Sequence, residues 1–230
     1  HTYGVIKQAE ELAGRMHLSA EDTDLARLIA LLHDIGRFEQ LKRYDSFEPG
    51  TMDHAAYGVK VLFDEGMIRR FLPDDKWDSI IYTAIAHHSD YELPEISDPQ
   101  TLLHAKLIRD EDKLDNCRVK LVDSTSTFIN VSEEELGTQN ITQKVYETVF
   151  ENKCILSADR VTQMDYWVSY IVYFFDINFK ESFDIIAEND YLNRIIDRIS
   201  YSNPVTKEQM ENIRVYMQNF INSHTNSQSF

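Results

Sequence analysis

The chain has 230 residues, of which 43% are hydrophobic, enough for the core of one large domain or two small ones. Its 39 acidic and 23 basic side chains give a formal net charge of −16, which argues against non-specific binding to nucleic acid or to an anionic membrane. Cys117 and Cys154 form no Cys-x-x-Cys pair, so we expect no disulfide framework, no structural zinc site, and a reducing, cytoplasmic compartment.

An all-α fold is expected, because apolar residues recur at i, i+3 and i+4 and only seven glycines and five prolines interrupt them. The pattern predicts helices over residues 2–16, 19–34, 51–65, 74–88, 99–117, 141–152, 157–177, 180–200 and 205–222. The apolar run 166–175 is too short to cross a bilayer, which needs about 20 residues, and its aromatic residues favour a core helix or subunit interface.

The connections divide these helices into two parts. Residues 38–50 mix charged and aromatic side chains with a Pro-Gly pair, which predicts a loop; this loop and residues 89–98 are expected to shape a substrate pocket. A polar connection after Val122 separates a core of residues 1–122 from helices in 123–230, both expected to belong to one compact domain with a frayed tail from His224. The chain starts at His1 without a methionine, so we expect native sequence upstream.

The segment Ala30–Arg37 carries the most informative motif, because an apolar helix ends in His33-Asp34 and Gly36 then lets the chain turn. Neighbouring helical side chains diverge by about 100°, so the pair is poorly placed to chelate one ion from one direction. A carboxylate has two oxygens, however, and can bridge two ions. His33-Asp34 therefore requires further ligands elsewhere in the chain.

Other histidines and aspartates at or near expected helix ends supply such ligands. The candidate set is His1, His33, Asp34, His54, His87, His88 and Asp112. Imidazole and carboxylate without thiolate suit Mn²⁺, Fe²⁺, Co²⁺, Ni²⁺ or Zn²⁺, and the surplus of ligands over one ion indicates two. Two ions can activate a water and neutralise charge on a phosphoryl group, while Arg37 or Lys113 could contact the phosphate. Singly, His54, His87-His88 and Asp112 are more often structural; His17, His104 and His224 are assigned to structure or solvent.

In this order the motifs resemble those of the HD-domain metal-dependent phosphohydrolase superfamily, over residues 1 to about 122. The resemblance implies an HD-type helical bundle in which His1, His33, Asp34 and Asp112 hold a first metal ion. It further implies that His54 and one or both of His87 and His88 hold a second, with Asp34 bridging. Spacing from Ala84-Ile85 favours His88 as the ligand, with His87 either supporting the ligands or serving as the alternate ligand.

Departures from the family's branches narrow the expected substrate. Residues 89–94 lack the Gly-Tyr-Pro segment of the cyclic-dinucleotide branch, and Arg37-Phe38-Glu39 does not match the acidic pair of the alarmone hydrolases. We therefore expect a metal-dependent phosphoric ester hydrolase that acts on a small phosphorylated metabolite or nucleotide through a hydroxide activated by two metals. An HD-type di-iron oxygenase and a non-catalytic nucleotide- or metal-binding regulatory module are the alternatives. Homo-oligomer formation is left open.

Overall fold

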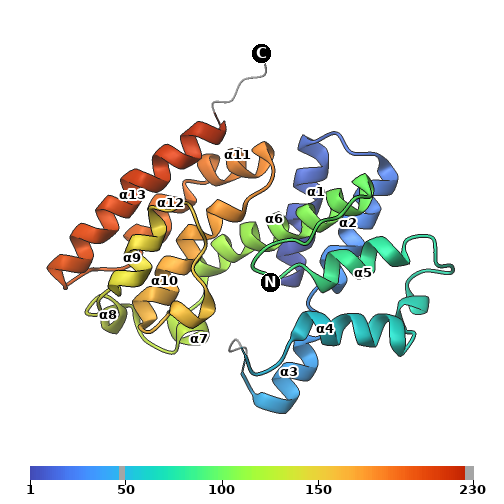
Figure 1. Ribbon diagram of the computed structural model, residues 1–230, viewed down its shortest axis with the longest axis horizontal. Coiled ribbons are helices and arrows are strands. Elements are labelled where there is room, and N and C mark those ends of the chain that lie inside the picture. Colours follow the sequence, from blue (N-terminus) through green and yellow to red (C-terminus); the bar gives the residue numbers. More distant parts are fainter. Residues whose placement is uncertain (47–49, 226–230) are drawn as a thin grey trace. The chain divides into compact units, whose positions relative to one another are not determined.

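A computed structural model describes residues 1–46 and 50–225, and all regular elements in these ranges are helical (Figure 1). This confirms the expected all-α class. The chain divides into two compact units, His1–Asp112 and Lys113–Phe230, so helix α6 (Pro99–Val122) contributes to both. Among the described helices, none is both long and apolar enough to cross a membrane.

The first unit combines a pair of longer helices with three shorter ones. Its α-helices before α6 are α1 (Thr2–Arg15), α2 (Ala20–Leu32), α3 (Arg37–Tyr44), α4 (His54–Val59) and α5 (Asp78–Ala86). α1 packs along α2, and α5 packs against both α2 and α4. The predicted apolar face of α1 is buried at Val5, Ala9, Leu12 and Ala13. The Ser19 side chain accepts a hydrogen bond from the Asp22 amide and caps α2 as expected.

Gly36 sets the distance between the α2–α3 turn and the start of α4. A Cβ atom at Gly36 would lie 2.0 Å from the His54 carbonyl oxygen and 2.9 Å from the Gly58 amide nitrogen. The backbone at Gly36 has φ −67°, so glycine is needed here for the close approach and not for a left-handed conformation. Only a residue without a side chain allows the two backbones to touch.

The loop expected over residues 38–50 is wrong for its first part, because α3 occupies Arg37–Tyr44. The helix presents mostly polar side chains, and Arg43 pairs with Glu39 one turn away at 2.6 Å, so its composition resembles that of a loop. Asp45, with φ 47°, ends the helix in the left-handed region. Residues 47–49 and the tail from 226 to 230 lie outside the described residues.

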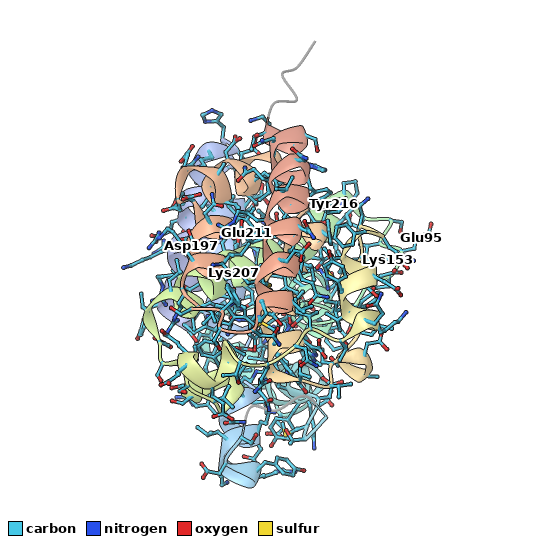
Figure 2. The ribbon with its side chains drawn as sticks, turned by 90° about the vertical axis from the view of Figure 1, so that its left-hand side faces the viewer. Glu95, Lys153, Asp197, Lys207, Glu211 and Tyr216 are labelled. Atoms are coloured by element: carbon cyan, nitrogen blue, oxygen red, sulfur yellow. The ribbon has the colours of Figure 1, made fainter. Side chains whose placement is uncertain are left out.

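The second unit is formed by α7 (Thr125–Ile129), α8 (Glu133–Leu136), α9 (Gln143–Val149), α10 (Gln163–Val172), α11 (Lys180–Glu188), α12 (Tyr191–Asp197) and α13 (Pro204–Thr225). α13 packs against α11 and α12. Figure 2 shows Asp197 of α12 near Glu211 and Lys207 of α13. Arg214 of α13 bonds to Asp197 on α12 and to Glu211 on its own helix. The aromatic run contributes buried Trp167 and Phe174, in agreement with a core role.

Several expected helices of this unit are shorter or divided. The predicted helix 180–200 breaks between α11 and α12, where Asp190 adopts a left-handed conformation with φ 51°. The predicted helix 157–177 contains only α10, flanked by 3₁₀ turns at Ser157–Asp159 and Tyr173–Asp176. Apolar periodicity continues across both breaks, so it identified the buried face but not the ends of the helices.

We predict that Gly36→Ala destabilises the protein by about 3 kcal/mol or more, because its Cβ overlaps the His54 carbonyl and the backbones must separate. Gly14→Ala in α1 is the matched control, since nothing lies within 4 Å of the added Cβ. It should stabilise the helix by roughly 0.5–1 kcal/mol. Urea unfolding of both variants measures the difference, and equal midpoints would contradict the close packing described for Gly36.

Candidate metal centre

The His33-Asp34 pair lies where α2 ends and the chain turns toward α3. His33 follows the last residue of α2 and is fully buried, while the Asp34 side chain is 19% exposed. Through Gly36 the turn packs against the first turn of α4, which begins at His54. The end of one helix and the start of another are thus held together at the motif.

His1 and His33 lie beside one oxygen of Asp34, and both also lie near Asp112. His1 Nε2 lies 2.9 Å from Asp112 Oδ1 and 3.9 Å from Asp34 Oδ2. His33 Nε2 lies 3.8 Å from the same Asp112 oxygen and 3.6 Å from Asp34 Oδ2. His1, His33 and Asp112 offer ligand atoms that all lie within 4.8 Å of one another. The N-terminus of α1, the end of α2 and the middle of α6 thus form one group that could hold a metal ion.

Two further histidines approach the other oxygen of Asp34. His54 Nε2 lies 3.3 Å and His88 Nε2 lies 3.5 Å from Asp34 Oδ1. The two imidazole nitrogens are 3.1 Å apart. His33, Asp34 and His88 also meet the criterion of ligand atoms within 4.8 Å. His1 and His33 therefore lie beside Oδ2 of Asp34, whereas His54 and His88 lie beside Oδ1, which is the arrangement a bridging carboxylate needs; His33 is close to both groups.

Backbone carbonyls orient two of these rings. His33 Nδ1 lies 2.8 Å from the Ala30 carbonyl, and His88 Nδ1 lies 2.7 Å from the Ile85 carbonyl. A carbonyl only accepts hydrogen bonds, so Nδ1 carries the proton and Nε2 keeps its lone pair. The buried His33 Nε2 has no hydrogen-bond partner, a costly state for a polar atom that a metal ion would relieve. The residues present therefore fit a divalent ion.

Burial and neighbouring charges set the protonation states needed for ligation. Burial lowers the pKa of His33, and burial followed by the charge of Arg37 lowers the pKa of His54 to about 3. Burial favours neutral Asp34 and Asp112, but the adjacent histidines outweigh it and hold the pKa of each carboxyl below its usual range. At neutral pH His33 and His54 are therefore neutral and both aspartates are charged, as metal ligands must be.

Two of the sequence candidates have other partners in the structure. His87 Nδ1 lies 2.6 Å from Asp90 Oδ2, and His87 belongs to neither metal-binding group. Lys113 Nζ lies 2.7 Å from Asp176 Oδ2 in the second unit. The distances therefore favour His88 over His87 as a ligand and offer no support for Lys113 as a phosphate contact. The ligand set and the catalytic roles stay predictions.

Arg37, the other candidate for a phosphate contact, does lie at the cluster. Its Nε is 3.4 Å from Asp34 Oδ1, and its side chain is 30% exposed. Its Nη1 donates to Gln40 Oε1 at 2.8 Å, and the fully buried Gln40 donates from Nε2 to Thr51 Oγ1 at 2.8 Å. The Gln40 side chain thereby fixes the position of the Arg37 guanidinium. Sequence analysis missed Gln40, although its i+3 spacing from Arg37 on a helix is the signal that could have revealed it.

The acidic run of α6 also differs from a solvated face. Arg109, Asp110 and Glu111 are buried, with exposed fractions of 2%, 0% and 0%. Both Glu111 carboxylate oxygens lack a hydrogen-bond partner. Burial, with the neighbouring charges of Asp110 and Asp112, raises the pKa of Glu111 well above its usual range. No sequence pattern distinguishes this buried stretch from an exposed charged one.

The fold and the cluster define an all-α protein with a histidine and carboxylate site of the composition that divalent metals prefer. The family model of the HD domain matches residues 1–117, just over half of the chain, and the chain belongs to the HD-domain family. HD domains bind divalent metals and are mostly metal-dependent hydrolases. Neither a search of curated proteins nor one of solved structures returned a match.

We predict that the metal-stripped protein loses stability as the pH falls from about 6.5, the ordinary histidine pKa. His54 has a folded-state pKa of about 3 against an ordinary value of 6.5, so between these values the unfolded chain binds the extra proton. Stability is therefore complete above 6.5 and declines below it, by at most about 1.4 kcal/mol per pH unit for this histidine.

Urea unfolding of the stripped protein between pH 7.5 and 5 measures this decline. Glu111 acts in the opposite direction, because its raised pKa lets the folded state hold the extra proton as the pH falls. Comparison with His54→Gln isolates the contribution of the histidine. The variant should show a shallower pH dependence than the parent, and parallel curves would contradict the assignment.

Proposed function

We propose that the protein is a metal-dependent phosphohydrolase with two divalent ions, acting on a small phosphorylated metabolite or a nucleotide. The observation that carries the proposal is the position of Asp34, whose two oxygens face different groups of histidines. Membership of the HD-domain family supports hydrolytic, metal-dependent chemistry. The net charge of −16 favours a small-molecule substrate over nucleic acid or a membrane surface.

In this proposal each ion has its own ligands. His1, His33 and Asp112 would hold the first ion with Asp34 Oδ2, and His54 and His88 would hold the second with Asp34 Oδ1. Mn²⁺, Fe²⁺, Co²⁺, Ni²⁺ and Zn²⁺ all accept such ligands. When bound, two ions lower the pKa of a water toward neutrality and neutralise charge that develops on a phosphoryl group.

The chain's own residues provide access and a cation for the phosphate. His33 is fully buried, whereas the side chains of His1 and Asp112 are 28% and 24% exposed, so one edge of the cluster faces solvent. Arg37 is partly exposed beside Asp34, and Gln40 fixes one of its nitrogens. A guanidinium can bond phosphate oxygens, and one that is already held in place loses little conformational entropy on doing so.

We predict that the protein binds two divalent ions, that Asp34→Ala loses both, and that His54→Ala loses one. The physical reason is that Asp34 offers an oxygen to each group, whereas His54 lies beside Oδ1 alone. Elemental analysis and calorimetric titration with Mn²⁺, Co²⁺ and Zn²⁺ measure the number of ions. His17→Asn is the control, because Asn tolerates the left-handed backbone of His17 at φ 53°; it should keep both ions.

A panel of phosphomonoesters and nucleotides with each metal then tests the reaction. Phosphate release that disappears in Asp34→Ala supports the proposal. Substrate-dependent oxygen uptake by an iron-loaded protein that releases no phosphate would instead favour the di-iron oxygenase. Tight nucleotide binding without turnover would favour the regulatory module. A protein that binds no divalent ion would contradict both the phosphohydrolase and the di-iron oxygenase.

For a substrate found in that panel, we predict that Arg37→Gln raises KM or lowers kcat/KM by about 10- to 100-fold, as expected for loss of a charged hydrogen bond. Metal content should not change, because Arg37 is not a ligand. Arg43→Gln on the same helix is the matched control, since Arg43 pairs with Glu39 instead. Gln40→Leu should have a smaller effect, absent in an Arg37→Gln background. Equal kinetics for Arg37→Gln and Arg43→Gln would exclude a phosphate contact.

A further inference from the structure

The chain that follows α5 carries His88 and turns sharply around one buried side chain. Arg109 of α6 donates from Nη1 to the carbonyls of His87 at 2.9 Å and Asp90 at 2.7 Å, with a longer contact of 3.4 Å to the His88 carbonyl. Its Nη2 lies 3.5 Å from the Tyr91 carbonyl. One guanidinium therefore contacts the main chain on both sides of His88.

The turn is also closed by its own side chains. His87 Nδ1 bonds Asp90 Oδ2 at 2.6 Å, and the Asp90 amide donates to the His87 carbonyl at 3.4 Å. The last carbonyls of a helix have no partner within that helix, and a cation at this end is favoured by the helix dipole. Arg109 meets both needs at the end of α5. The His88 ring is bonded in its turn to the Ile85 carbonyl and reaches Asp34 Oδ1.

We propose that Arg109 is a positioning residue for the second metal ion, and that it acts by fixing the main chain that carries His88. This inference rests on the proposed two-ion function. Arg109 is not one of the proposed ligands, and it acts through the main chain. It keeps His88 Nε2 within 3.5 Å of Asp34 Oδ1 and 3.1 Å of His54 Nε2, the separation that lets these atoms share one ion.

The chemistry of the contact requires arginine. Arg109 is 2% exposed, so its charge is removed from water, and the carbonyl dipoles it meets help to offset this cost. The planar guanidinium presents several donors in a fixed geometry, which suits carbonyls that lie on different sides of the turn. A lysine ammonium is a single point of charge and cannot reach the same carbonyls together.

The first ion should be affected far less. Asp112 lies three residues after Arg109, but the backbone of the 24-residue helix α6 holds it in place. His1 precedes α1, and His33 is oriented by the Ala30 carbonyl. None of these depends on the turn after α5. Loss of Arg109 is therefore expected to weaken binding of the second ion while the first ion still binds. A general loss of folding would weaken both.

The experiment is a calorimetric Mn²⁺ titration of the full chain and of Arg109→Gln, with the folded state of each checked by circular dichroism. We expect the second ion to bind about 10- to 100-fold more weakly in the variant, as is typical when a group that supports a ligand is removed. The first ion should keep its affinity within about twofold, a selective change that simple destabilisation does not give. Spin-coupled Mn²⁺ signals in electron paramagnetic resonance should give way to those of isolated ions.

Arg109→Lys and Arg118→Gln complete the design. Arg109→Lys keeps the charge and provides the same test if Arg109→Gln does not fold; it too should weaken the second ion. Arg118 bonds Asp115 on the same helix at 2.6 Å, so Arg118→Gln should lower stability while both ions bind as in the parent. Two ions bound with parental affinities in a folded Arg109 variant would overturn the inference. A parent chain that binds no second ion would instead overturn the proposed function.

Discussion

The contact between Gly36 and the first turn of α4 is the constraint on which the candidate site depends. Because glycine brings the backbone after His33-Asp34 against the His54 carbonyl, the end of α2 and the start of α4 cannot separate without opening the cluster. His54 thereby reaches one oxygen of Asp34, while His33 stays beside the other. A local backbone contact thus determines the spacing of groups that are twenty residues apart in the chain.

The site concentrates polar and charged groups that a stable core would avoid. His33 Nε2 is buried without a partner, and Glu111 is buried beside Asp110 and Asp112 with neither carboxylate oxygen bonded. Each such group costs free energy that the surrounding apolar helices must offset. Unsatisfied buried groups cluster at functional sites because ligands can satisfy them there. The same buried polar groups therefore account for both the electrostatic cost and the proposed metal binding.

α6 joins the separate parts of the first unit. It carries Asp112 to His1 and His33, and three residues earlier it carries Arg109 to the turn that holds His88. His104 Nε2 of the same helix lies 3.2 Å from Asp22 Oδ1 near the start of α2, so its imidazole, which the sequence assigns to structure or solvent, contributes to packing. A single long helix is an effective support because its backbone hydrogen bonds hold all these side chains in a fixed register.

The HD-domain family could be identified from the sequence because the ordered series of His1, His33-Asp34, His54, His87-His88 and Asp112 is itself a linear pattern. Helix periodicity likewise predicted α1 and α2, whose apolar faces follow a regular spacing. It missed α3, where polar side chains hide the period, and it ran through Asp190, where a single left-handed residue ends a helix. These features depend on local conformation and composition, so periodicity alone cannot detect them.

Tertiary structure decided which groups meet. Sequence spacing favoured His88 over His87, but only the fold shows one ring beside Asp34 and the other bonded to Asp90. Lys113 and Arg37 were equal candidates for a phosphate contact until the structure paired Lys113 with Asp176 and placed Arg37 beside Asp34. The sequence likewise did not reveal that Arg109 and Glu111 are buried within their charged run. The sequence determined which candidate ligands were present and in what order, whereas the directions and environments of their side chains depend on packing between distant helices.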